Sequence, residues 1–295
     1  MWKNIGKSLL WGWVYTAAST VGILSAMIFS LFMDPSIFML DADAFFDAWM
    51  SLVMDVAIPG MFIANIICII VYCGYKRVRK YNPEITKITF SRSAFCLSLG
   101  VTFNLIITYV LDYIWTYLPK DIINSAEEAS AMLSTDQYSW VFLLLVIGIT
   151  TPIAEEIVFR HGFCRVLSRS NVWVGVLFSS LLFGFAHANL VQGVYTFVLG
   201  LICAIVLLRT NNIWYPIFIH MGLNCTTVLS DAVSEDIAML VFTTAGFVCL
   251  TICTTMLIHK KDIQTLFVKE KAQEPIEVEG ANSANLPESI TDIEL

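Results

Sequence analysis

Long apolar runs separated by short polar stretches dominate this chain. A helix that crosses a lipid bilayer needs about 20 predominantly apolar residues. Windows of that length, or nearly so, recur eight times, which predicts an all-α polytopic membrane protein with about eight transmembrane helices. The eight windows are residues 8–33, 51–74, 94–118, 138–159, 172–189, 192–208, 213–230 and 237–258.

The positions of the basic residues predict how these helices are oriented. Of the 17 lysines and arginines, all but Lys120 precede the first window, follow the last or lie in alternate loops. Because loops rich in lysine and arginine stay in the cytoplasm, we expect both termini to be cytoplasmic. The first apolar run is too long for a signal-peptide core, so we expect it to be retained as a span. One outer loop, residues 125–134, is expected to form a short helix.

Composition agrees with this interpretation and excludes several classes of protein. Apolar residues make up 57% of the chain and charged residues only 14%, against about a quarter charged in ordinary soluble proteins. A formal charge of -7 argues against a basic surface for nucleic acid. The eight cysteines form no CxxC motif, which argues against a disulfide framework or a zinc finger. The lipid bilayer is therefore the expected environment, and nucleic acid is not an expected partner.

The sequence divides into four parts with different expected roles. The first holds three helices and the outer loops, the second holds the candidate chemistry, the third is a final span, and the fourth is an acidic, disordered cytoplasmic tail. Their boundaries are residues 1–137, 138–231, 232–259 and 260–295.

Ionisable groups inside the apolar windows form three short motifs. Such groups cost several kcal/mol in a bilayer unless they are paired or face water, so each is a candidate functional residue. Spacing of four places Glu156 with Arg160, and His220 with Asn224, on one helix face, and it puts Phe183 one turn before His187. We expect an ion pair within the first motif, between its second glutamate and the arginine, with the first glutamate facing elsewhere. The motifs comprise Glu155, Glu156 and Arg160; Phe183 and His187; and His220 and Asn224.

We expect the three motifs to lie at a similar depth in the membrane. Glu155 and His187 each lie 16 residues from a turn expected near Asn171, so an antiparallel hairpin would bring them level. His220 and Asn224 lie about 10–17 Å from the next cytoplasmic turn. We therefore expect one common site in the cytoplasmic half of the membrane.

These groups are suited to hydrolysis by an activated water molecule. A carboxylate or imidazole can take the proton of water, and neighbouring donors can stabilise the oxyanion that forms on a peptide carbonyl. A metal-assisted version is equally possible, since Glu155, His187 and His220 would give zinc one carboxylate and two imidazoles and leave a position for water. The residues alone do not decide between the two.

The three motifs resemble those of the CAAX protease and bacteriocin-processing membrane proteins, which include the type II CAAX prenyl endopeptidases. The resemblance covers residues 138–230. It implies an eight-helix intramembrane endopeptidase that opens to the cytoplasm of a bacterial cell and cleaves a membrane-associated peptide or protein. It also implies roles: water activation by Glu155 and His187, an oxyanion pocket of His220 and Asn224, and support from Glu156, Arg160 and Phe183. Zinc and a metal-free glutamate mechanism are both compatible with this resemblance.

Two other functions remain possible from the sequence. A non-catalytic membrane partner, such as a bacteriocin immunity factor or a scaffold for a sensor or secretion system, would keep the fold without the chemistry. A transporter or proton relay would use Glu155 together with Asp55 and Asp112. For these two aspartates, polar contacts between helices are the simpler interpretation.

Overall fold

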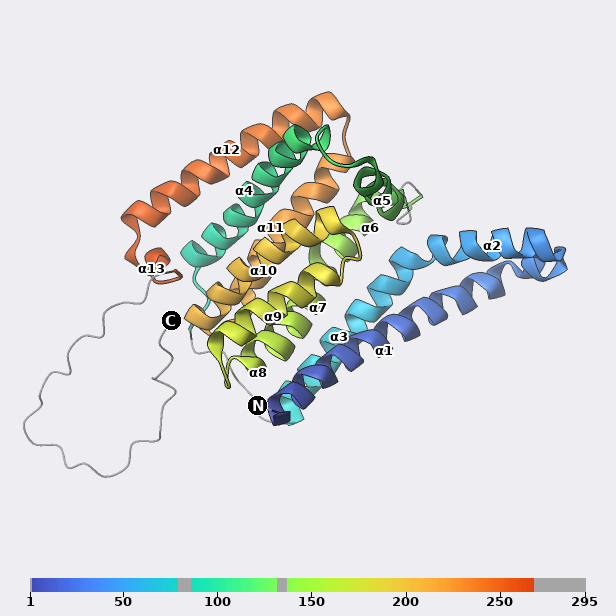
Figure 1. Ribbon diagram of the computed structural model, residues 1–295, viewed down its shortest axis with the longest axis horizontal. Coiled ribbons are helices and arrows are strands. Elements are labelled where there is room, and N and C mark those ends of the chain that lie inside the picture. Colours follow the sequence, from blue (N-terminus) through green and yellow to red (C-terminus); the bar gives the residue numbers. More distant parts are fainter. Residues whose placement is uncertain (1, 79–85, 132–136, 268–295) are drawn as a thin grey trace, which may run out of the picture.

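The computed structural model describes residues 2–78, 86–131 and 137–267. Within these ranges the chain is helical and contains no strand (Figure 1), which confirms an all-α membrane protein. Six helices are long and apolar enough to cross a membrane. They are α1 (Trp2–Met33), α3 (Ala57–Val78), α4 (Phe90–Trp115), the continuous helix from Trp140 to Leu167, α10 (Leu190–Thr210) and α12 (Glu235–His259).

The two remaining windows also form helices, but these are shorter or more polar. They are α9 (Val172–Phe185) and α11 (Trp214–Asp231). At 1.5 Å per residue α9 is about 21 Å long, which is less than the roughly 30 Å of a bilayer core. The chain therefore turns into α10 before α9 can cross, and His187 lies in that turn.

Two predicted boundaries differ from the structure. The window at 51–74 is divided between two helices. Its first residues form the C-terminal end of α2 (Ala42–Asp55). The short helix η1 (Pro35–Met39) precedes α2. Helix α3 then starts afresh with Pro59 in its first turn, where the missing N–H of proline is tolerated. The predicted outer helix is α5 (Lys120–Ala131), which begins before residue 125; residues 132–134 lie outside the described ranges.

The predicted tail at 260–295 begins with an ordered, packed segment. Residues Lys261–Gln264 form α13, and Ile263 and Leu266 are fully buried. Arg92 of α4 donates hydrogen bonds to the carbonyl of Asp262 and the hydroxyl of Thr265. This segment therefore belongs to the bundle. The rest of the predicted tail, residues 268–295, lies outside the described residues.

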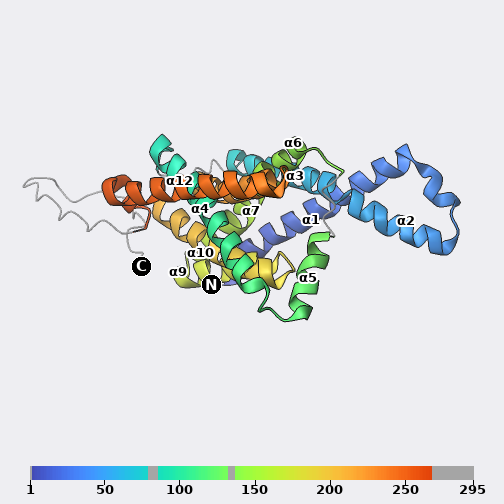
Figure 2. The same cartoon turned by 90° about the horizontal axis from the view of Figure 1, so that it is seen from above.

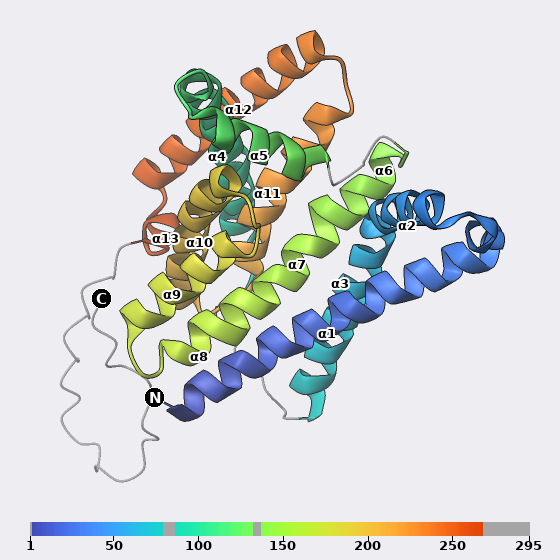
Figure 3. The same cartoon turned by 45° about the vertical axis from the view of Figure 1, so that its right-hand side comes forward.

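Helix α11 occupies the centre of the bundle. It packs between α4 and the long helix and also contacts α10 (Figures 1 and 3). Helix α12 lies on the outside of α4, and α1 and α3 pair on the opposite side of the long helix. Helix α2 and the end of α1 project beyond the bundle (Figure 2). The two central helices α4 and α11 approach closely at Gly100 and Gly222.

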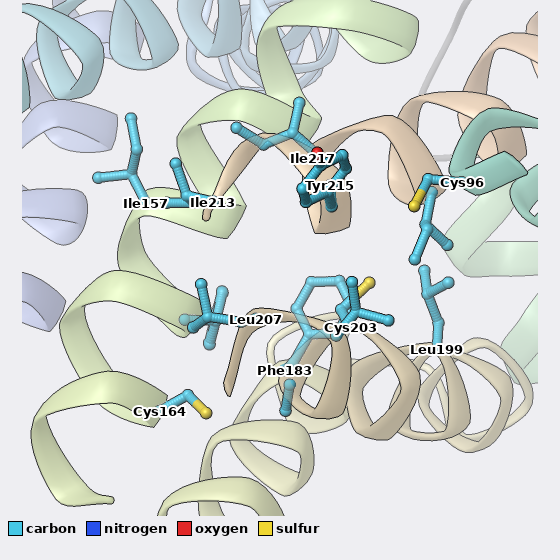
Figure 4. Close-up of a cluster of buried hydrophobic side chains, with 14 of the residues drawn as sticks. Cys96, Ile157, Cys164, Phe183, Leu199, Cys203, Leu207, Ile213, Tyr215 and Ile217 are labelled. Carbon is cyan, nitrogen blue, oxygen red and sulfur yellow. The ribbon is translucent and has the colours of Figure 1, made fainter. Parts of the chain in front are cut away.

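The main core lies where the long helix, α9, α10 and α11 converge. Figure 4 shows side chains from these helices and from α4 pointing into one cluster. Its labelled members are all nearly or completely buried: Cys96, Ile157, Cys164, Phe183, Leu199, Cys203, Leu207, Ile213, Tyr215 and Ile217. A rigid apolar layer thus surrounds the three motifs.

The close approach of α4 and α11 generates a stability prediction. A Cβ atom added at Gly100 would collide with the backbone carbonyl of Ile219, and backbone cannot move aside as a flexible side chain can. We expect Gly100→Ala to destabilise the protein by about 1–3 kcal/mol and to lower the unfolding temperature in detergent. Gly74→Ala is the matched control, because nothing lies within 4 Å of a Cβ there; it should leave the unfolding temperature unchanged or raise it slightly. Equal effects of both variants would contradict the packing argument.

Candidate active site

The long helix is irregular on both sides of the glutamate pair. It runs through α6 (Trp140–Leu143), η2 (Leu144–Thr150), α7 (Thr151–Glu156), η3 (Ile157–Cys164) and α8 (Arg165–Leu167), where η2 and η3 are π-helical. Pro152 has no N–H to donate to the carbonyl of Gly148. The N–H of Thr151 bonds to the carbonyl of Val146, so the carbonyl of Ile147 loses its usual helical partner. Two carbonyls are therefore free for other contacts.

Helix α11 uses both of these carbonyls. Asn224 donates its side-chain N–H to the carbonyl of Ile147 at 2.9 Å, and the Cys225 thiol donates to the carbonyl of Gly148 at 3.3 Å. These bonds fix α11 against the long helix. His220 lies one turn earlier on α11 and is thereby directed at the glutamate pair.

His220 lies between the two carboxylates. Its Nδ1 atom is 3.1 Å from Oε1 of Glu156, and its Nε2 atom is 3.6 Å from Oε2 of Glu155. The Glu156 side chain is completely buried, whereas that of Glu155 is 15% exposed. Glu155 is thus the carboxylate of the pair that water or a substrate can reach.

The predicted pair of Glu156 and Arg160 is confirmed. Arg160 Nε lies 3.0 Å from Glu156 Oε2, and both side chains are inaccessible to solvent. The guanidinium also lies 4.5 Å from the centre of the Phe183 ring, a favourable cation–π distance. Glu156 is therefore held by Arg160 on one oxygen and by His220 on the other.

Phe183 connects the second motif to the other two. Its ring packs edge-on against His187 at 5.0 Å and against His220 at 5.5 Å between ring centres. It also contacts Phe159 at 5.1 Å. The long helix and α9 are antiparallel, and Glu155 and His187 each lie about one turn from the contact between Phe159 and Phe183. This contact therefore puts Glu155 and His187 at the same level. The sequence predicted the same register.

His187 is oriented by the backbone of its own helix. Its Nδ1 atom lies 2.8 Å from the carbonyl of Phe183. Since a carbonyl can only accept, Nδ1 carries the hydrogen, and in the neutral ring Nε2 is then an acceptor. His187 is partly exposed, so this acceptor suits it to take a proton from water.

The sequence did not predict two neighbours of the site. Asn65 of α3 is fully buried and donates to the hydroxyls of Thr150 and Thr151 at 3.2 and 2.8 Å. Tyr15 of α1 lies near Glu155. Neither residue belongs to a recognisable motif. The sequence offered one signal for Asn65, which is an amide side chain within an apolar window, and none for Tyr15.

The aspartates of the alternative relay lie elsewhere. Asp55 ends α2, where its carboxylate is 3.3 Å from the side-chain amide of Gln137 and its carbonyl accepts from Tyr138. Asp112 is exposed on α4. The described contacts of Asp55 are polar contacts between segments, in line with the simpler interpretation.

The arrangement does not fit a formed zinc site. Among the residues that the structure describes, no group of three or more His, Cys, Asp or Glu side chains converges as metal ligands would. Glu155, His187 and His220 are all described. Both ring nitrogens of His220 face carboxylates, and one of those of His187 faces a carbonyl. Three of the four imidazole nitrogens of these two histidines are therefore already directed at protein oxygens.

A carboxylate, two imidazoles and an amide thus meet among apolar helices, as expected of an intramembrane hydrolase. Comparisons with known proteins agree. Residues 137–226 match the family described as type II CAAX prenyl endopeptidase Rce1-like. This match confirms the resemblance to the CAAX protease family that the three motifs indicate.

Two curated proteins are similar to parts of the chain. "Putative membrane peptidase YdiL" of Bacillus subtilis (strain 168) is 33% identical over 114 residues, which cover 38% of this chain and 46% of that protein. An "uncharacterized 24.3 kDa protein" of Escherichia coli is 35% identical over 88 residues, or 28% of this chain and 40% of that protein. The chain thus spans less than half the length of these relatives. No solved structure gives a significant match.

The buried pair of Glu156 and Arg160 generates a second prediction. Arg160→Met leaves Glu156 without its buried cation and should cost about 3–5 kcal/mol of stability. The double variant Glu156→Gln with Arg160→Met removes both charges and should recover most of that loss. Unfolding temperatures of the three proteins in the same detergent provide the test. A double variant that is no more stable than Arg160→Met would show that the pair is not the stabilising contact.

Proposed function

We propose that this protein is an intramembrane endopeptidase that hydrolyses a peptide bond of a membrane-associated protein or peptide. The observation that carries the proposal is the position of His220 between Glu155 and Glu156, beside a second imidazole and inside apolar helices. Charged groups are rarely buried together in a membrane unless a reaction or transport step needs them. The family match over residues 137–226 supports a hydrolytic use.

In the proposed reaction, water is activated at the accessible carboxylate. Glu155 and the Nε2 atom of His187 orient the water, and one of them takes its proton while the oxygen adds to the peptide carbonyl. The tetrahedral intermediate then expels the amine, which receives the same proton as the C–N bond breaks. The products are a new carboxyl terminus and a new amino terminus, and no covalent enzyme intermediate forms.

Donors from α11 stabilise the oxyanion of that intermediate. Nε2 of His220 is 3.6 Å from Glu155, beyond normal hydrogen-bond length. When the ring carries a hydrogen on both nitrogens, Nδ1 donates to Glu156 and Nε2 can donate to an oxyanion nearby. One N–H of the Asn224 amide is bound to the carbonyl of Ile147, and the second is available because an amide has two. Glu156 and Arg160 act as positioning residues, since they hold His220 and do not face solvent.

We further propose that eight helices contribute to the membrane domain and that both termini are cytoplasmic, in a bacterial cell membrane. The distribution of basic residues supports this orientation. Figure 1 supports it as well, because the start of α1, the turn between α8 and α9, and α13 all lie on one side of the molecule.

A comparison of peptide N-termini in membranes tests the proposed activity. Cells carrying the wild-type protein should produce new N-termini that cells carrying Glu155→Ala at equal expression lack, because the variant has no accessible carboxylate to activate water. Asp112→Asn, which removes an exposed acid from another span, is the control and should retain the wild-type pattern. Cys225→Ala, which loses the bond to the carbonyl of Gly148, should lower the yield of the new N-termini without abolishing them.

The other outcomes distinguish the remaining hypotheses. Loss of cleavage in Cys225→Ala but not in Glu155→Ala would indicate a thiol nucleophile. Identical N-termini from wild type and Glu155→Ala, together with rescue of a null phenotype by the variant, would overturn the peptidase proposal in favour of a non-catalytic membrane partner.

A further inference from the structure

A buried arginine near the end of the long helix has no hydrogen-bond partner among the residues that the structure describes. Arg165 is 8% exposed, and none of its three guanidinium nitrogens has a hydrogen-bond partner among the described residues. Arg160, five residues earlier, has its ion pair with Glu156. A buried guanidinium is costly unless an anion balances it. Arg165 is therefore the described cation whose counter-ion most needs an explanation.

A second unpartnered polar group lies opposite Arg165. Asn4 of α1 donates to Ser170, and Trp11 packs against Gly162. In this antiparallel register Ser8 lies beside Arg165 and Val166. Ser8 is 1% exposed, and its hydroxyl has no hydrogen-bond partner in the described part of the chain. The interface of α1 and α8 thus contains a guanidinium and a hydroxyl, both buried and both able to donate.

The surroundings of this interface are basic. Arg169 lies four residues after Arg165, in the turn that follows α8, and is exposed. Arg165, Arg169 and Lys76 of α3 all lie within electrostatic range of His161. An anion approaching past Arg169 therefore meets several positive charges.

We propose that Arg165, together with Arg169 and Ser8, forms a binding site for a phosphate-group anion between α1 and α8. Guanidinium groups bind phosphate oxygens through paired hydrogen bonds, and a serine hydroxyl can donate one more. The long helix is long and apolar enough to cross a membrane and ends two residues after Arg165, so in the proposed orientation Arg165 comes near the level of the lipid headgroups. A lipid headgroup and free inorganic phosphate share this chemistry, and the experiment below distinguishes these sources.

Thermal unfolding of the full-length protein in neutral detergent tests this site. The probes are phosphatidylglycerol, zwitterionic phosphatidylcholine as its control, and inorganic phosphate at constant ionic strength. We expect phosphatidylglycerol to raise the unfolding temperature of the wild type by about 5 °C relative to phosphatidylcholine, since a ligand that binds the folded state stabilises it. A comparable rise with inorganic phosphate alone would identify free phosphate as sufficient.

Three variants separate a built site from general attraction between charges. Arg165→Gln should lose most of the rise, yet in phosphatidylcholine it should be at least as stable as the wild type, because it removes an unbalanced buried charge. Arg165→Lys should retain part of the rise. Arg77→Gln, which removes an exposed cation from the end of α3, should retain all of it.

Several results would overturn the proposal. The first is that the wild type unfolds at the same temperature with all three probes. The second is that Arg165→Gln shows the same rise in unfolding temperature as the wild type. The third is that Arg77→Gln loses as much of this rise as Arg165→Gln does. If Arg165→Gln does not fold, native mass spectrometry of the wild type gives the answer. Preferential retention of phosphatidylglycerol or phosphate, reduced at least threefold in Arg169→Gln and unchanged in Arg77→Gln, would support the site, and no preference would overturn it.

Discussion

The rest of the structure depends on the buried ion pair of Glu156 and Arg160. Two charges inside an apolar bundle are tolerated only when their partners are fixed. Glu156 has Arg160 on one oxygen and His220 on the other, and Arg160 lies against the Phe183 ring. The long helix, α9 and α11 are therefore held together by the groups that orient the candidate active site. Stability and chemistry cannot be separated here.

Irregular backbone makes that arrangement possible. A regular α-helix would use the carbonyls of Ile147 and Gly148 internally, and α11 would then lose its two hydrogen bonds to the backbone of this helix. Pro152 and the π-helical turns free both carbonyls for Asn224 and Cys225. Directional hydrogen bonds then fix the rotation of α11, which apolar packing alone specifies poorly. The single turn between Asn224 and His220 transmits this orientation to the carboxylates.

Sequence reasoning predicted the contacts that follow from helical periodicity. The pairing of Glu156 with Arg160 and the common level of Glu155 and His187 both depend on regular spacing along helices, and both agree with the structure. The bond from Asn224 to Ile147 was not predicted, because it requires a local departure from that periodicity. Nor were the contacts of Asn65 and of the segment after Lys260, which depend on tertiary packing that no local pattern specifies.

The short length of α9 keeps His187 out of a membrane-spanning helix. Non-helical backbone at membrane depth is tolerated where it lines a polar cavity or is buried in protein. The turn after α9 contains His187 and Ala188, which has a left-handed backbone with φ of 52°, and Asn189 then caps α10. A cavity of about 410 Å³ beside it is lined by polar Asn189, Gln192 and Glu127 as well as by aromatic side chains. A full-length α9 would bury His187 in an apolar helix, whereas this turn leaves the imidazole partly exposed, two residues before Asn189 of the cavity lining.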